Sequence, residues 1–480
     1  MARKKPAQAQ PVQLACEKAL GTAAILLIAF HTWISFARHL FAPENMISKS
    51  ETLQEIMRYE RRAALLLLCA LIAYLIVTRV RYRDTWYRVR EAFHRLVCRE
   101  SVLLAAICGW YVVSCLVYRG QYGGIFKAYD WWLYDMALCL LVMFPVSALL
   151  GVKRARAWFG YMFHAVMLFS TGFAAWVLWN LFHLNIVTLP NGLQVGMMKS
   201  YSLYAGVNQN IGAAIGTSMV FISLYMIASQ RWPLKIVYAV ALIPHLLMTL
   251  LTNSRANYLA LLVTLPLAGF MAVWNRTGNW RGARRILVSA AAAAVIAAVF
   301  WWLRSGVFQG FDAVTHFGER IGARSGGMAR KMDGLDPARA RIWRSSLKLM
   351  FSSARRFFFG IPFGNVSDAI REAMKEIYGS GGTFAHAHNM ILQVGVCLGV
   401  PAMAAFVAFL VMMVVRCIRV GLGMAKGAFA GAYILPIAVL AFMIVNMFEP
   451  FLLLYVSVMA CLFFLFCGWI TTMDREAADA

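Results

Sequence analysis

The chain has 480 residues, of which 61% are hydrophobic and only 14% are charged, and its formal net charge is +25. A soluble domain is nearer half apolar and one quarter charged, so this composition indicates a membrane protein and argues against two or three soluble domains. The basic residues flank apolar segments and form no single stripe. The charge therefore argues against nucleic-acid binding, and it favours anionic lipid headgroups and phosphate-bearing substrates as partners.

Apolar segments of about twenty residues recur along the chain, and this is the length needed to cross about 30 Å of hydrocarbon. Because only a helix satisfies its own backbone groups in lipid, each segment predicts a transmembrane helix. The segments are 19–40, 62–79, 101–118, 131–150, 157–182, 209–229, 235–252, 255–274, 286–303, 388–415, 428–447 and 451–470. The predicted fold is an all-α polytopic membrane protein with about twelve transmembrane helices.

The distribution of lysine and arginine predicts the orientation of these helices. If the N-terminus is cytoplasmic, the cytoplasmic connections hold 24 of these residues and the short outer connections hold 9. Basic residues concentrate on the cytoplasmic side, so we expect both termini in the cytoplasm and the protein in the cytoplasmic (inner) membrane. The expected parts are a cytoplasmic tail (1–18), helices one to nine (19–303), a long extracytoplasmic loop (304–387), helices ten to twelve (388–470) and a second cytoplasmic tail (471–480). No cleavable signal peptide is expected, because the first apolar segment is too long.

The long loop contains a first amphipathic segment that follows Asp336-Pro337, a pair typical of a helix N-terminus. A helical wheel predicts one apolar face and one basic face on this helix. The apolar face consists of Trp343, Leu347, Met350 and Phe351, and the basic face of Arg341, Arg344 and Lys348. The basic face is either part of a binding site or an ordinary solvated face.

A rigid turn at 360–364 separates this helix from a second one, which has Val366, Ile370 and Met374 on one face. The glycine-rich segment 379–382 then predicts a hinge. Two amphipathic helices beside a membrane-embedded bundle are typical of a lid over the bundle.

Three helices that begin at the predicted outer face start with polar residues: Asn208-Gln209-Asn210, Asn253-Ser254-Arg255 and His386-Ala387-His388-Asn389. A helix N-terminus presents free N–H groups and partial positive charge, so an arginine there favours a bound anion such as phosphate. The alternatives are ordinary helix capping by Asn253 or Ser254, an Arg255 side chain that reaches the lipid headgroups, and ordinary loop histidines at 386 and 388.

Several kinds of catalytic machinery are missing from the sequence. The cysteines form no CxxC pair, and no acidic residue lies at ligand spacing from His386 and His388, so no metal or other cofactor is predicted. The sequence contains no Walker motif, nucleophile elbow or DxD motif, and Asp135 and Glu449 lie near the outer ends of spans. A substrate carried on a lipid diphosphate would suit a cation-rich outer site.

These segments resemble the O-antigen ligase and O-antigen polymerase superfamily of bacterial envelope glycosyltransferases. The matching pieces, in order, are Thr252-Asn253-Ser254-Arg255, Arg341-Ile342-Trp343 with the turn 360–364, and His388-Asn389 followed by Leu392-Gln393 and Gly395. The resemblance implies a fold of the GT-C type and a glycan donor linked to a polyprenyl diphosphate such as undecaprenyl diphosphate. The glycan is transferred to an acceptor hydroxyl outside the cytoplasmic membrane, without metal or nucleotide.

The resemblance also implies roles for individual residues. The essential arginines of the family fall on Arg255 and Arg341, and its essential histidine falls on His388. The arginines would stabilise charge on the leaving diphosphate. His388 would accept the acceptor's proton or bind the diphosphate as a cation. Expected substrate-binding residues are Asn208, Asn210, Asn253, Ser254, Arg344, His386 and Asn389. Ligase and polymerase remain alternatives, and a lipid-linked glycan transporter or flippase is an alternative of another class.

Overall fold

The computed structural model describes most of the chain. The described residues are 11–41, 51–81, 90, 94, 96–118, 130–188, 194–198, 202–205, 209–278, 280, 282–317, 337–379, 386–423, 429, 431–453 and 457–478. Of the described residues, 85% are helical. The all-α polytopic prediction is confirmed, with the small addition of three short strands that form an antiparallel sheet in the order β1-β2-β3.

The elements follow one another as a nearly continuous series of helices. The first half contains α1 (Pro11–Phe41), α2 (Glu51–Arg81), α4 (Arg99–Val117), α6 (Asp130–Leu138), the π-helix η1 (Cys139–Met143), α7 (Val146–Phe182), β1 (Val187–Thr188), β2 (Gln194–Met198), β3 (Ser202–Tyr204) and α8 (Gln209–Ser229). The second half contains α9 (Trp232–Leu251), α10 (Arg255–Arg276), α11 (Gly282–Thr315), α14 (Pro337–Met350), α15 (Ala354–Phe359), α16 (Phe363–Tyr378), α17 (Met390–Leu398), α18 (Val400–Gly421), α19 (Ile434–Asn446) and α20 (Val458–Ala478).

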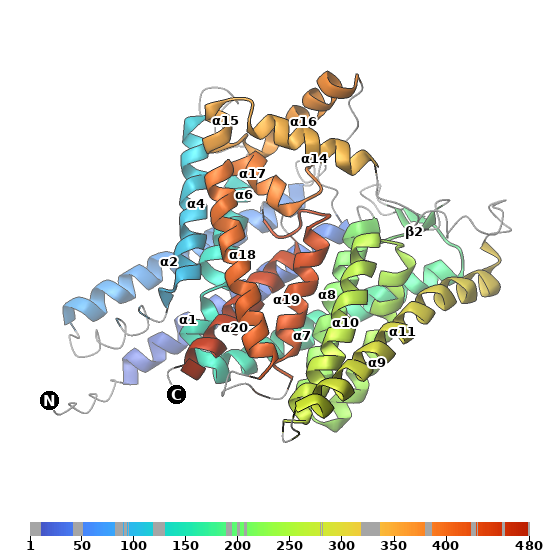
Figure 1. Cartoon of the computed structure of the whole chain (residues 1–480). Coiled ribbons are helices and arrows are strands. Elements are labelled where there is room, and N and C mark those ends of the chain that lie inside the picture. Colours follow the sequence, from blue (N-terminus) through green and yellow to red (C-terminus); the bar gives the residue numbers. More distant parts are fainter. Residues whose placement is uncertain are drawn as a thin grey trace.

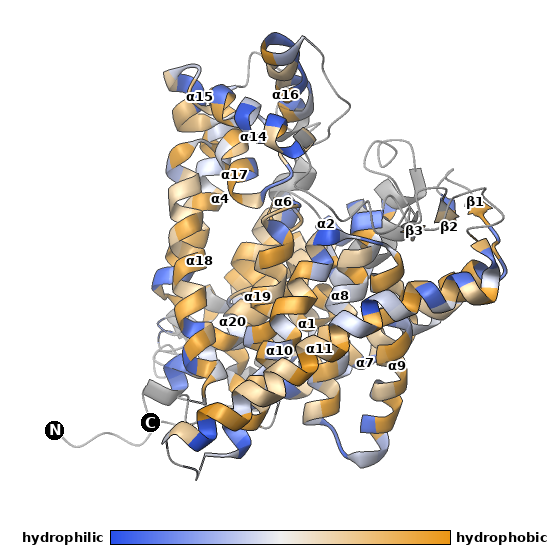
Figure 2. Cartoon of the chain, turned by 45° about the vertical axis from the view of Figure 1, so that its right-hand side comes forward, coloured by the Kyte–Doolittle hydropathy of each residue, from blue (hydrophilic) through white to orange (hydrophobic). Residues whose placement is uncertain are grey.

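Within the described residues, nine helices are long and apolar enough to cross a membrane. Three shorter apolar helices, Lys18–Ile34, Tyr134–Met143 and Ile434–Asn446, lie in three further predicted spans. Each of the twelve predicted segments therefore contains an apolar helix, although the number that crosses the bilayer stays a prediction. Figure 2 shows the mostly hydrophobic residues of these helices, and the mixture of hydrophilic and hydrophobic residues along α14 and α16 beyond one end of the bundle.

Glycines mark two places where the helical path changes. At Gly151 the backbone has φ +73°, so α7 is two helices joined by a break, at the predicted end of the span 131–150. At Gly399 (φ +85°) the predicted span 388–415 divides into α17 and α18. Both conformations lie in the left-handed region, where only glycine is free of steric penalty.

The helix α11 differs from its predicted end at residue 303, because it continues to Thr315 and enters the first part of the predicted loop. Phe308 and Phe311 are buried, and their spacing keeps one apolar face on the helix beyond the predicted span. The division of the chain at 303/304 therefore stays a prediction. Asp336 and most of the hinge segment 379–382 lie outside the described residues.

The two predicted amphipathic helices of the loop are present as α14 and α16, at one end of the bundle (Figure 1). On α16 the predicted face is correct, since Val366, Ile370 and Met374 are all buried.

The predicted apolar face of α14 matches the buried face only in part. Met350 is buried and Trp343 is partly buried, but Leu347 and Phe351 are 44% and 62% exposed. Ser345 and Ser346, which the prediction did not include, are fully buried. The wheel ranks serine as polar, but its small side chain allows α14 to pack closely against α16 and α17.

The short helix α15, which the sequence did not predict, attaches the loop to α4. The indole Nε1 of Trp110 on α4 donates to the carbonyls of Phe358 and Leu398, both at 3.0 Å. Ser114 and Tyr118 donate to the next two carbonyls, Phe359 and Gly360, each at 2.5 Å. The middle of the loop is thus fixed to a spanning helix, and its function as a lid stays a prediction.

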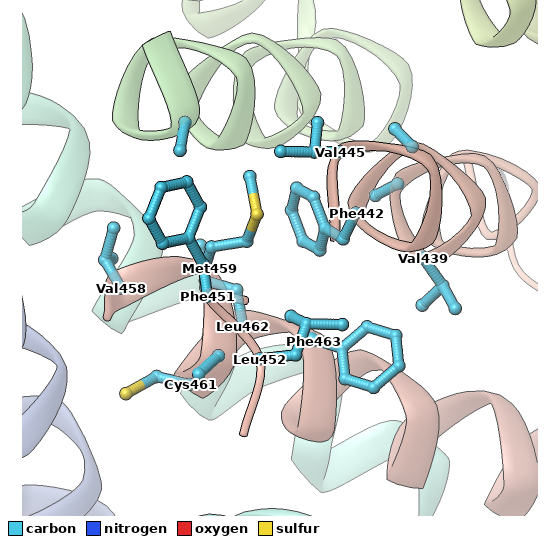
Figure 3. Packing of buried hydrophobic residues seen from close by; sticks show 14 of the residues in the cluster. Val439, Phe442, Val445, Phe451, Leu452, Val458, Met459, Cys461, Leu462 and Phe463 are labelled. Atoms are coloured by element: carbon cyan, nitrogen blue, oxygen red, sulfur yellow. The ribbon is translucent and has the colours of Figure 1, made fainter. Parts of the chain in front are cut away.

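A buried part of the core lies where α19 and α20 meet. Phe442, Phe451, Met459 and Phe463 are among its buried side chains (Figure 3). Asn446 stabilises the chain reversal after α19, because its Oδ1 accepts from the Phe451 amide at 2.6 Å. Glu449 lies in this reversal, between the two residues that the hydrogen bond joins.

Candidate active site

The first part of the candidate site is the start of α10. Ser254 is its N-cap residue and is buried, and Arg255 is its first helical residue and is exposed. Asn257 Nδ2 donates to Ser254 Oγ at 3.0 Å, and Thr217 Oγ1 donates to Asn257 Oδ1 at 2.8 Å. These bonds fix the helix start against α8. Asn253 has φ +53°, so the chain enters α10 through a left-handed residue.

The second part is the start of α17. Asn389 is its N-cap, with Oδ1 accepting from the Leu392 amide at 3.0 Å and Nδ2 donating to the Met447 carbonyl at 3.0 Å. Ala387 N–H donates to Gln393 Oε1 at 2.7 Å, and His388 has φ +49°. The amide of Asn389 therefore acts in capping and in attachment to the turn after α19, which is the capping function its position favours.

A buried carboxylate, Glu449, brings residues of four segments together. Its Oε1 accepts from Asn210 Nδ2 and from an Arg339 guanidinium nitrogen, each at 2.8 Å. Its Oε2 lies 3.2 Å from His388 Nδ1 and 3.9 Å from His386 Nε2. We call these five residues the Glu449 cluster. It unites three predicted residues, Asn210, His386 and His388, with two that sequence reasoning missed, Glu449 and Arg339.

A weak sequence signal for the missed residues exists. Glu449-Pro450 directly follows an apolar helix in a chain with only 21 acidic residues, and Arg339 lies two residues before Arg341. Neither signal shows that the two residues meet, because they are 110 positions apart in the sequence.

Opposing effects set the charges in the Glu449 cluster. Burial alone would raise the pKa of the Glu449 carboxyl, but the hydrogen bond from His388 and the positive charge around the carboxylate, including that of Arg339, hold that pKa below its usual value. Burial lowers the pKa of His386 to about 3, helped by the charge of His388. At neutral pH Glu449 is therefore ionised and His386 is neutral.

Helix α8 connects the two parts of the site. Asn210 at its start contacts Glu449, and Thr217 seven residues later bonds to Asn257 near the start of α10. Seven residues of α-helix correspond to about 10 Å. The helix start with Arg255 and the Glu449 cluster therefore lie at the same end of the bundle.

The basic residues of α14 lie at the edge of this region. Trp343 Nε1 donates to the His388 carbonyl at 3.3 Å, so α14 contacts the start of α17 directly. Arg341 is exposed and its guanidinium lies over the Tyr378 ring, 5.4 Å from the centroid, and Arg344 is also exposed. The other predicted residue, Asn208, lies outside the described residues.

His386, His388 and Glu449 are also the kind of group that holds a metal ion, since one ligand atom from each lies within 4.8 Å of the others. The sequence did not indicate this possibility, because the carboxylate is 61 residues from His388. Arg339 already places a fixed positive charge on the same carboxylate, and this charge opposes binding of a dication.

The spanning helices and the polar residues gathered at one end of the bundle define a polytopic membrane protein with a cation-rich site at that end. The sequence model of the O-antigen ligase family matches residues 239–407. This match confirms the resemblance to the O-antigen ligase and polymerase superfamily and places residues 239–407 in it. It supports a membrane enzyme of ligase or polymerase type in envelope polysaccharide synthesis. No curated protein matches the chain.

Proposed function

We propose that this protein transfers a glycan from a polyprenyl diphosphate to the hydroxyl of an acceptor, on the extracytoplasmic side of the cytoplasmic membrane. The proposed reaction is metal-independent and inverts the anomeric centre. A ligase is the favoured form, because the matching family is described as O-antigen ligase. A polymerase of the same superfamily uses the same type of donor and differs in its acceptor.

The chemistry requires stabilisation of a leaving diphosphate. Arginine remains charged at any physiological pH and binds phosphate oxygens with a planar fork. We assign this role to Arg255, at the positive end of α10, and to Arg341 on α14. Charge that grows on the leaving group is then stabilised more in the transition state than in the bound substrate, which is what accelerates the reaction.

The observation that carries the proposal is the convergence of separate polar helix starts at one end of the bundle. Arg255 begins α10 and His388 directly precedes α17, and α8 connects their surroundings through Asn210 and Thr217. An arginine at a helix start and a histidine held by a buried carboxylate supply an anion-binding group and a proton-accepting group.

The proposal is tested with purified protein in liposomes that contain a lipid-diphosphate-linked glycan and an acceptor lipid. Replacement of Arg255 or Arg341 by Ala is expected to lower the transfer rate about a hundredfold each, because loss of one charged donor costs about 3 kcal/mol in the transition state. His388→Ala is expected to lower the rate by a similar factor, because it removes the group that accepts the proton. Arg371→Ala is the matched control, since this exposed loop arginine on α16 pairs with the exposed Asp368, at 3.1 Å, and lies outside the Glu449 cluster.

Three results would lead to different conclusions. Full activity in all three alanine variants would refute the assignment. Products that grow as a ladder of repeats without an acceptor lipid would identify a polymerase instead of a ligase. Movement of the lipid-linked glycan between leaflets without covalent transfer would identify a flippase.

A further inference from the structure

The two oxygens of Glu449 have different partners, and this division has a chemical consequence. Oε1 accepts two hydrogen bonds, from Asn210 and Arg339, and Oε2 faces the ring nitrogens of His388 and His386. Asn210 and Arg339 come from α8 and α14, so they hold the carboxylate from two directions. Because Glu449 is only 1% exposed, no bulk water competes for these positions.

The tautomer of His388 follows from this arrangement. Oε2 of an ionised carboxylate can only accept, so the proton shared between the two groups resides on His388 Nδ1. In the neutral ring the lone pair then belongs to Nε2. Two hydrogen bonds hold the backbone here and so reinforce this orientation. Trp343 Nε1 donates to the His388 carbonyl, and the side chain of the next residue, Asn389, donates to the Met447 carbonyl.

We propose that Glu449 is the positioning residue for His388, and that Asn210 and Arg339 fix Glu449 for this task. The inference rests on the proposed function, and it assigns His388 the role of base instead of that of a diphosphate-binding cation. The acceptor oxygen forms its bond to the anomeric carbon while its proton passes to His388 Nε2. The bond between that carbon and the diphosphate oxygen breaks, and its electron pair leaves with the diphosphate. The imidazolium that results is paired with the Glu449 carboxylate.

The test is Glu449→Gln, which preserves the size of the side chain. A glutamine oxygen can accept from Asn210 and Arg339 or from His388, but its amide group can only donate. If the amide faces His388, the ring must accept at Nδ1 and carries its proton on Nε2, so it no longer acts as a base. A change of this kind next to a catalytic histidine lowers kcat by several orders of magnitude in serine proteases. We expect kcat to fall at least about a hundredfold, with the KM for the lipid-linked donor within about threefold of the wild-type value.

Glu100→Gln is the matched control. Glu100 is also a buried carboxylate paired with an arginine, Arg416, at 2.6 Å, and it lies on α4 outside the candidate site. Both variants lose a buried ion pair and are expected to lower the melting temperature. Only Glu449→Gln is expected to lower kcat of the folded protein, and Glu449→Asp, which retains a carboxylate, is expected to recover part of the rate.

Five results separate the alternatives. A kcat for Glu449→Gln within threefold of wild type would overturn the proposal, and so would a loss confined to the KM for the donor. If His388→Ala is inactive while Glu449→Gln is active, the proposed function stands and the positioning role fails. If His388→Ala is fully active, His388 is not the base, and both the proposed chemistry of the site and the positioning role of Glu449 are refuted. If EDTA abolishes wild-type transfer and Zn²⁺ restores it, His386, His388 and Glu449 form a metal site and the positioning role is refuted.

Discussion

At the scale of single residues, the candidate site contains two backbone conformations and one buried polar atom that each lower the stability of the folded protein. Asn253 and His388 both have positive φ, a region that non-glycine residues enter at a cost of about 1–2 kcal/mol. The Nδ2 of Asn253 is buried, and it has no hydrogen-bond partner among the described residues. A buried donor of this kind costs about 1–3 kcal/mol unless a ligand accepts its hydrogen bond.

These costs predict different results for two replacements of Asn253. Asn253→Gly should retain the melting temperature, because glycine accepts φ +53°, but it should lower kcat/KM for transfer about tenfold through the lost amide. Asn253→Ala should lower both quantities, because alanine is also strained there. Thermal unfolding in detergent and the liposome transfer assay measure the two effects. Full activity of Asn253→Gly would show that the residue serves the backbone alone.

At the scale of helices, hydropathy predicted most of the fold and little of the site. Apolar length determines where a helix can cross a membrane, and each predicted segment contains an apolar helix. Which side of a loop helix is buried depends on what packs against it. Ser345 and Ser346 of α14 are therefore buried where a wheel expects polar exposure. The Glu449 cluster escaped prediction for a related reason, since its residues come from α8, α14 and the segments before α17 and α20, and no local pattern connects them.

The attachment of α15 to its neighbours gives a prediction about two glycines of the loop. Gly360 has φ +69°, and a Cβ added to it would lie 2.3 Å from the carbonyl carbon of Cys397. A Cβ on Gly379 would meet nothing within 4 Å, although φ is +71°. Gly379→Ala should therefore cost only the strain of its backbone, about 1–2 kcal/mol. Gly360→Ala should cost about 2–5 kcal/mol, because a steric clash with α17 is added to the strain.

Melting temperatures of the two glycine variants, measured in the same detergent, test this difference. The Gly360→Ala protein should melt well below the Gly379→Ala protein, with wild type above both. Equal melting temperatures would show that the contact between α15 and α17 adds nothing to stability.

At the scale of the whole molecule, the arrangement of the helices shows which elements share an end of the bundle, and the positions of the charges predict which end is cytoplasmic. The loop helices α14, α15 and α16 lie beyond one end of the bundle, and α20 ends near the opposite end (Figure 1). Lys153, Arg154, Arg284 and Arg285 belong to the connections that are predicted to be cytoplasmic, and these connections carry most of the basic residues outside the long loop. The positive-inside rule then predicts an extracytoplasmic position for the Glu449 cluster and Arg255, where a lipid-linked glycan would meet its acceptor.

This orientation is tested by inserting reporter domains into the full chain. Alkaline phosphatase inserted after Gly379 should be active, because that enzyme folds only outside the cytoplasm, and a fluorescent protein fused after Ala480 should be fluorescent. The reciprocal pair, a fluorescent protein after Gly379 and phosphatase after Ala480, should be inactive. The reverse pattern would place the candidate site in the cytoplasm, and a donor exposed on the outer leaflet could not reach it. Insertion at Gly379 is suitable because this residue ends α16 and has open space around it, so the reporter reads the position of the loop without breaking a packed contact.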